Sequence, residues 1–119
     1  MNRSEILDEA KRLTTGDRQA EYGEPWRVYG VVAQMMEAYL NGRRAAGDAE
    51  IVITAEDVLN IMALVKIGRI ATGKVKADSY IDGAGYMALA GEVATNNGAR
   101  NTGATTTSKT VCARKWRPT

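Results

Sequence analysis

The chain has 119 residues, of which 45% are hydrophobic and 25% charged, and its formal net charge is +2. These values are typical of one soluble globular domain. The sequence contains no histidine, which removes the commonest neutral metal ligand and the usual general base near neutral pH. Any acid–base or metal chemistry therefore depends mainly on carboxylates, lysine or tyrosine. The single cysteine, Cys112, excludes an intramolecular disulfide and a cysteine-based zinc site within one chain, and it indicates a reducing compartment.

Charge divides the chain into two parts, residues 1–96 and 97–119. All 14 acidic residues lie in the first part, which has a net charge of −3, whereas the second part has five basic residues and no acidic one. We expect an all-α domain at 1–96 and a flexible, basic, low-complexity tail at 97–119. The charged N-terminus is unlike a signal peptide, and no apolar run approaches a membrane span. The protein is therefore expected to be cytoplasmic and to have no contact with a membrane.

The first half of the domain predicts two helices joined by a polar loop. The first helix runs from about Asn2 to Leu13, with Asn2 as its N-cap and Glu5 three residues later. The second begins near Pro25, which suits a first helical turn, and ends at the "NG" of residues 41–42. Its apolar stripe, expected to pack in the core, comprises Trp26, Tyr29, Ala33, Met36 and Leu40. Within the connection at 41–53, the "IVI" run is either a β-bridge or a hydrophobic staple.

Two further helices are predicted in the second half of the domain. The third begins with a capping box, in which Thr54 accepts from the amide of Asp57 and the carboxylate reaches back. It extends to about Ala71, and its apolar stripe comprises Val58, Ile61, Met62 and Val65. The fourth covers about Ala77 to Ala94. Four short helices bury little apolar surface alone, so we expect a helical hairpin core completed by a second copy in a homodimer or tetramer.

The fourth helix contains three glycines that require a reason. Gly83, Gly85 and Gly91 each lower helix stability by about 1 kcal/mol relative to alanine in an exposed helix interior. Close approach of a neighbouring backbone is the expected reason.

Polar residues are expected to converge where the third and fourth helices meet. The short connection between these helices makes them antiparallel, which places Lys66 and Arg69 near Asp78 and Asp82. The two aspartates lie four residues apart on one helical face, where like charges repel. Either Asp78 caps the fourth helix while Asp82 pairs with Lys66 or Arg69, or the two carboxylates bind a cation.

The loop between the first two helices forms a second polar cluster. Asp17 and Arg18 bring opposite charges, and Tyr22 and Trp26 offer flat aromatic faces. A guanidinium beside aromatic rings suits a phosphorylated ligand that carries a base. A loop that only connects two helices can have the same composition, and no Walker loop or dinucleotide fingerprint is present in the sequence.

Three stretches, "GDRQAEYGEPW", "ITAEDVLNIMALVKIGRI" and "KADSYIDGAGYMALAG", resemble small phage and prophage proteins of uncharacterised function. Their overall pattern is similar to that of the MazG-like all-α nucleoside triphosphate pyrophosphohydrolases, over roughly residues 14–94. The resemblance implies a four-helix MazG-like bundle and Mg²⁺-dependent hydrolysis of a nucleoside polyphosphate. In that superfamily, a helix with Glu-Glu-x-x-Glu is followed by one with Glu-x-x-Asp, and together they hold Mg²⁺ against the triphosphate.

The resemblance also assigns individual residues. "EDVLN" takes the place of the first motif, with Glu56 and Asp57 on the paired glutamates and Asn60 on the third, and "DSYID" places Asp82 on the aspartate of the second. Glu56, Asp57 and Asp82 are thus the expected catalytic residues, and Asp57, Asp78 and Asp82 the expected Mg²⁺ ligands. Two departures are clear: Asn60 carries no charge, and Asp78 precedes Asp82 by four residues rather than three.

The expected nucleotide contacts come from the loop and from the helical hairpin: Asp17, Arg18, Tyr22, Trp26, Lys66, Arg69 and Tyr86. Three functions of different classes remain open. The first is Mg²⁺-dependent hydrolysis of a nucleotide, and the second is nucleotide binding without turnover, which sequesters a nucleotide signal. The third is an oligomeric adaptor whose basic tail binds nucleic acid in a salt-dependent manner.

Overall fold

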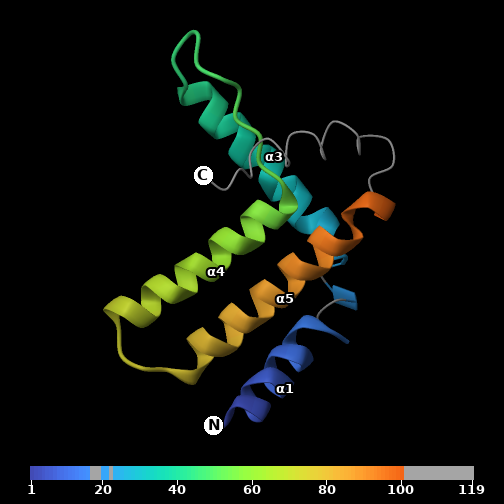
Figure 1. Ribbon diagram of the computed structural model, residues 1–119, viewed down its shortest axis with the longest axis vertical. Helices are drawn as coiled ribbons and strands as arrows, with labels where there is room; N and C mark the ends of the chain where they lie inside the picture. The colour runs from blue at the N-terminus through green and yellow to red at the C-terminus, as the bar shows by residue number, and fades with distance from the viewer. Residues whose placement is uncertain (17–19, 22, 101–119) are drawn as a thin grey trace.

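The computed structural model describes residues 1–16, 20, 21 and 23–100. Within these residues all regular secondary structure is helical: α1 (Arg3–Thr14), α3 (Pro25–Arg43), α4 (Ala55–Thr72) and α5 (Ala77–Arg100) (Figure 1). This confirms the predicted all-α architecture of four helices. The predictions for Asp17, Arg18, Tyr22 and most of the basic tail lie outside the described residues.

The helices begin where their capping chemistry predicts. Asn2 Oδ1 accepts a hydrogen bond of 2.9 Å from the amide of Glu5, and Pro25 is the first residue of α3. The capping box of α4 is complete, because Asp57 N donates to Thr54 Oγ1 at 3.1 Å and Thr54 N donates to Asp57 Oδ2 at 2.9 Å. Such bonds satisfy amides that a helix start leaves unpaired. Asp57, predicted as a metal ligand, therefore caps α4.

Two helices extend beyond their predicted C-terminal ends. α3 passes through Asn41 and Gly42 and ends at Arg43, and α5 continues past Ala94 to Arg100. The predicted domain boundary at residue 96 therefore falls inside a helix. Asparagine and glycine both lower helix stability, glycine by about 1 kcal/mol relative to alanine, and tertiary contacts of α3 offset this cost.

Asn41 shows what those contacts are. Its amide side chain bonds both backbone groups of Ile51, with Oδ1 accepting from Ile51 N at 2.8 Å and Nδ2 donating to Ile51 O at 2.9 Å. Glu37 Oε2 accepts from Ile53 N at 2.7 Å. The "IVI" run therefore forms no β-bridge, because side chains from α3 satisfy the backbone groups that a neighbouring strand would have bonded.

The helices pack around the antiparallel α4–α5 hairpin, as predicted. In Figure 1, α1 lies beside α5, and α3 crosses the start of α4. A buried cluster of Leu59, Ala90 and Val93 joins the start of α4 to the second half of α5, and side chains of α3 pack against it. Among the described residues, no helix is long and apolar enough to cross a membrane.

The core within one chain is thin, and its α4 face differs from the predicted one. Val58 is buried as expected, but Ile61 and Val65 are 38% and 42% exposed, and the buried neighbours are Leu59 and Ala63 instead. The reason is that α4 packs on α5 and α3, which turns its contact face away from the predicted stripe. The buried hydrophobic residues of the described part are Ala10, Ala33, Val58, Leu59, Ala63, Ile81, Ala90 and Val93.

Of Gly83, Gly85 and Gly91 in α5, only Gly85 lies at a close approach. A Cβ added there would be 3.1 Å from Thr14 Cγ2 of α1, whereas one at Gly83 would meet Lys66 Cβ at an ordinary 3.8 Å. At Gly91 nothing lies within 4 Å. A close approach is thus found at Gly85, but the neighbour is a side-chain methyl group, so the predicted approach of a neighbouring backbone is wrong.

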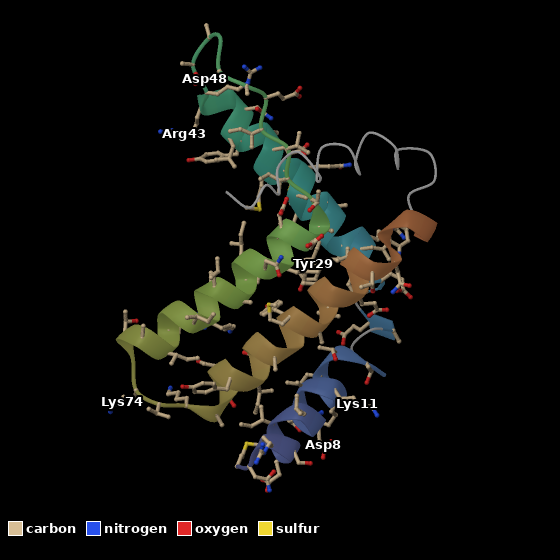
Figure 2. All side chains as sticks on the ribbon, viewed as in Figure 1. Asp8, Lys11, Tyr29, Arg43, Asp48 and Lys74 are labelled. Atoms are coloured by element: carbon tan, nitrogen blue, oxygen red, sulfur yellow. The ribbon has the colours of Figure 1, made fainter. Side chains whose placement is uncertain are left out.

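The charged side chains that Figure 2 labels lie at the outside of the molecule, and one tyrosine lies near its centre. In Figure 2, Tyr29 is placed where α3, α4 and α5 come together. The labelled charged residues are exposed at the periphery: Asp8, Lys11, Arg43, Asp48 and Lys74. Tyr29 is thus a polar side chain in the interior region between the helices.

Candidate functional site

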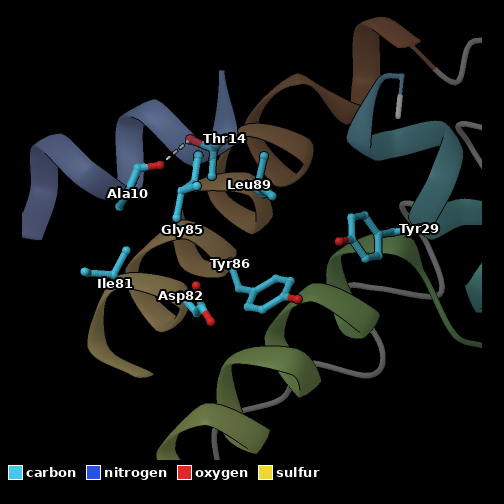
Figure 3. A pocket seen from close by; sticks show the side chains of 9 residues that line it. Ala10, Thr14, Tyr29, Ile81, Asp82, Gly85, Tyr86 and Leu89 are labelled. Atoms are coloured by element: carbon cyan, nitrogen blue, oxygen red, sulfur yellow. Dashed lines mark hydrogen bonds between the residues drawn. The ribbon is translucent and has the colours of Figure 1, made fainter. Parts of the chain in front are cut away.

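A pocket of about 250 Å³ lies where α1, α3 and α5 meet (Figure 3). Its polar side chains include Asp82 and Tyr86, one turn apart on α5, and Tyr29, which faces them from α3. The complete lining is Ala10, Leu13, Thr14, Tyr29, Ile81, Asp82, Gly85, Tyr86 and Leu89. The pocket thus combines apolar side chains with hydrogen-bonding groups.

The close packing of α1 on α5 shapes one wall of this pocket. Thr14 Oγ1 donates to Ala10 O at 2.9 Å within α1 (Figure 3), and its methyl group lies over Gly85. Because glycine has no side chain, α1 approaches α5 closely enough for Ala10 and Leu13 to reach the pocket.

Asp82 forms an ion pair with Lys66 of α4, with Nζ and Oδ2 3.0 Å apart. This confirms the interpretation in which Asp82 pairs with a basic residue of the third predicted helix. The side chain of Lys66 is 14% exposed and that of Asp82 37% exposed. The ammonium group is therefore largely covered, whereas the carboxylate reaches the pocket.

Asp78 does not occupy the cap position that one interpretation gave it. α5 begins at Ala77, so that Asp78 lies inside the first turn, where it is exposed. A carboxylate there interacts favourably with the positive end of the helix dipole. Asp78 and Asp82 thus share one face of α5, as their spacing predicts.

Tyr29 is an uncharged hydrogen-bonding group at neutral pH. Burial raises the pKa of its phenol above the ordinary value, and the nearby Tyr86 adds to the effect. Removal from water disfavours the phenolate. Tyr29 therefore offers a neutral hydroxyl to the pocket.

The predicted catalytic and metal-binding residues do not converge within one chain. Glu56 and Asp57 lie at the start of α4, whereas Asp78 and Asp82 lie at the start of α5, and an antiparallel hairpin places these starts at opposite ends (Figure 1). Lys66, the partner of Asp82, lies about 13 Å along the α4 axis from Asp57. In the part of the chain that the structure describes, no three Asp, Glu, His or Cys residues are grouped so that they could hold a metal ion.

The remaining predicted contacts have different surroundings. Trp26 packs against the buried cluster around Leu59, so its observed role is core packing. Tyr86 packs against the same cluster and also lines the pocket. Arg69 is exposed near the C-terminal end of α4.

Sequence reasoning placed Tyr29 in the core stripe and missed its position in the pocket. A phenol that is partly buried needs a polar partner for its hydroxyl. This requirement could have indicated that Tyr29 faces other polar groups. The α1 residues Ala10 and Leu13 carried no comparable signal, because apolar residues of an amphipathic helix look alike whether they fill a core or line a cavity.

The chain matches a family model described as a domain of unknown function, DUF6378, over residues 5–94. It belongs to this family, and the matched region includes every residue of the pocket and the Lys66–Asp82 pair. The chain is also similar to the "Gene 55 protein" of Mycobacterium phage D29, with 37% identity over 81 residues. This alignment covers 68% of the chain and 48% of the phage protein, so that the chain spans about half the length of this curated relative. No solved structure matches the chain, and the MazG-like resemblance stays a prediction.

Proposed function

We propose that this protein binds a nucleotide in the pocket between α1, α3 and α5. The observation that supports the proposal is that Asp82 and Tyr86 line one pocket while Lys66 of α4, outside the lining, is paired with Asp82. From the sequence, Lys66 and Tyr86 were expected to contact a nucleotide, and Asp82 was expected to be a catalytic residue and a Mg²⁺ ligand. Tyr29 and the carboxylate of Asp82 supply hydrogen-bonding groups, and the apolar walls suit a flat ring.

Binding without turnover is the form that the geometry supports best. Mg²⁺ in nucleotide sites is bound by carboxylates, waters and phosphates. Within one chain, Asp78 and Asp82 lie together but Asp57 does not, and Asp82 is already paired with Lys66. The single chain therefore does not fit the predicted Mg²⁺ site, and we derive no hydrolytic step through it. A protein of this kind would sequester a nucleotide signal.

Mg²⁺-dependent hydrolysis of a nucleoside polyphosphate remains the alternative within the same proposal. It requires a second copy of the chain to bring Glu56 and Asp57 beside Asp82. The adaptor hypothesis concerns the basic tail, most of which lies outside the described residues, and it stays a prediction from the sequence.

We also propose that the protein is a homodimer or tetramer. Val31, Met35 and Tyr39 form a stripe along α3 at helical spacing, and they are 52%, 59% and 65% exposed. Leu64 of α4 is 62% exposed. Contiguous exposed apolar residues in a small domain mark interaction surfaces, and the thin core supports a second copy as the partner. Light scattering that shows a monomer at micromolar concentration would contradict this.

A nucleotide screen tests the binding proposal. Thermal-shift measurements with and without Mg²⁺ would be made over common nucleotides, and each one that binds would be incubated and analysed by chromatography. Binding without new products supports sequestration, whereas Mg²⁺-dependent release of phosphate or pyrophosphate supports the hydrolase. If no nucleotide binds under either condition, the proposal is wrong.

A further inference from the structure

We infer that Asp82 recognises the amino group of a nucleobase, so that the base enters the pocket and the phosphates remain outside it. This inference rests on the proposed function and names the part of the ligand that the pocket holds. Of the nine described residues that line the pocket, only Asp82 is charged. A carboxylate accepts hydrogen bonds from N–H groups and repels phosphate. The lining therefore favours the uncharged end of a nucleotide.

The ion pair with Lys66 holds the recognising carboxylate in place. Asp82 Oδ2 lies 3.0 Å from Lys66 Nζ, and no described residue donates a hydrogen bond to its other oxygen, Oδ1. The covered ammonium group anchors one side of the carboxylate while the 37% exposure of Asp82 leaves the other side accessible. A carboxylate fixed through one oxygen is preorganised to accept from a ligand through the other.

The shape of the pocket agrees with a base as its occupant. Its volume of about 250 Å³ is smaller than the roughly 300–1,000 Å³ of sites that enclose drug-sized ligands, so it suits part of a nucleotide. Leu13 of α1 and Leu89 of α5 provide apolar walls for a flat ring. Tyr29 and Tyr86 offer hydroxyl groups to its remaining polar edges.

The inference predicts a preference between closely matched bases. Adenine and cytosine carry an exocyclic amine where hypoxanthine and uracil carry a carbonyl oxygen. An amine donates to Asp82 Oδ1, whereas a carbonyl oxygen in its place is repelled by the carboxylate. Because a hydrogen bond to a charged group is lost, we expect adenosine and cytidine nucleotides to bind about tenfold or more tightly than inosine and uridine nucleotides.

The test measures dissociation constants for ATP, ITP, CTP and UTP in EDTA, with wild-type protein and with Asp82→Asn. In the variant, Lys66 donates to the amide oxygen, so that the amide NH₂ faces the pocket as a donor. The preference should then disappear or reverse in favour of ITP and UTP. Glu92→Gln, an equal loss of charge at an exposed position of the same helix outside the pocket lining, serves as the matched control and should keep the wild-type preference.

The outcomes separate failure of base recognition by Asp82 from failure of nucleotide binding. Equal affinities for amino and carbonyl nucleotides in the wild type overturn the inference while leaving nucleotide binding intact, and so does a preference that persists in Asp82→Asn. Failure of all four nucleotides to bind the wild type contradicts the proposed function itself. If Asp82→Asn does not fold, wild-type affinities for adenosine and for purine riboside, which lacks the amine, replace it: a less than threefold difference overturns the inference.

Discussion

Lys66 and Asp82 join the two helices of the hairpin through a contact of 3.0 Å between Nζ and Oδ2, beside the pocket. Asp78 and Asp82 carry like charges four residues apart on one face of α5, and Lys66 supplies Asp82 with a cationic partner from the protein itself. Since the Asp82 side chain is 37% exposed, water screens the pair, and its contribution to stability is smaller than that of a fully buried pair.

Asp82→Asn should therefore destabilise the fold moderately. Exposed pairs contribute up to about 1 kcal/mol and the breaking of buried ones costs about 3–5 kcal/mol, so we expect a loss of roughly 1–2 kcal/mol. Urea denaturation in EDTA and in excess Mg²⁺ measures this loss, and it should be the same in both. If instead the metal-free variant is as stable as the wild type or more stable, and Mg²⁺ stabilises only the wild type, Asp82 is a cation ligand.

Gly85→Ala and Gly91→Ala should have different effects although both glycines lie in α5. At Gly91 the new methyl group meets nothing within 4 Å, and the variant should gain up to about 1 kcal/mol from helix propensity. At Gly85 it would lie 3.1 Å from Thr14 Cγ2, so that α1 must shift and the gain should be reduced or reversed.

Thermal unfolding of both glycine variants provides the comparison, and Thr14→Ser provides the control. Serine lacks the methyl group but keeps the hydroxyl that donates to Ala10 O. Gly85→Ala combined with Thr14→Ser should therefore recover stability relative to the sum of the single changes. Equal stabilisation by Gly85→Ala and Gly91→Ala would show that α1 does not pack closely at this point.

Asn41→Ala should loosen the segment before α4. The variant loses the hydrogen bonds of 2.8 and 2.9 Å to Ile51, and each contributes about 0.5–1.5 kcal/mol. We expect a total loss of about 1–3 kcal/mol and faster amide exchange at Ile51. Gln34→Ala, at an exposed position of the same helix, should leave both quantities nearly unchanged. Unaltered exchange at Ile51 in Asn41→Ala would argue against the side-chain bonds.

Tyr29→Phe should change how stability depends on alkaline pH. Burial raises the pKa of Tyr29, so the folded protein holds this proton more tightly than the unfolded chain, in which tyrosine titrates near 10. The resulting stabilisation is complete below about pH 10 and is lost as the pH rises through the higher folded-state pKa. Above about pH 10, the free energy of unfolding should therefore fall more steeply for the wild type than for Tyr29→Phe.

Urea denaturation from about pH 7 to about pH 11 checks this prediction. Tyr80→Phe removes a tyrosine that is 46% exposed and lies outside the exposed α3 stripe, and its curve should follow that of the wild type. Curves for wild type and Tyr29→Phe that stay parallel over the whole range would mean that burial does not hold the proton on Tyr29.

Local chemistry made much of the fold predictable. Asn2, Pro25 and Thr54 start helices through bonds or backbone angles that depend on adjacent residues, and the antiparallel hairpin follows from its short connection. The helix ends were less predictable, because the bond from Asn41 to Ile51 is a tertiary contact.

Part of the candidate site was predictable from charge complementarity between neighbouring helices. Lys66 and Asp82 were expected to meet, and they do. Asp57 and Asp82 are far apart because they lie at opposite ends of an antiparallel hairpin. A match between short motifs contains no information about these positions along the helices. The place of Tyr29 depends on how α3 crosses the hairpin, and no local pattern encodes that crossing.

Methyl NMR during nucleotide titration tests the central claim most directly, since it locates the ligand. Leu13, Ile81 and Leu89 line the proposed pocket, whereas Ile67 lines a second, apolar hollow between α4 and α5, and Leu64 is exposed on α4. We predict saturable shifts at Leu13, Ile81 and Leu89 with little change at Leu64 and Ile67. Shifts confined to Leu64 and Ile67, or no saturable shift with any nucleotide, would contradict the claim that the pocket between α1, α3 and α5 binds a nucleotide.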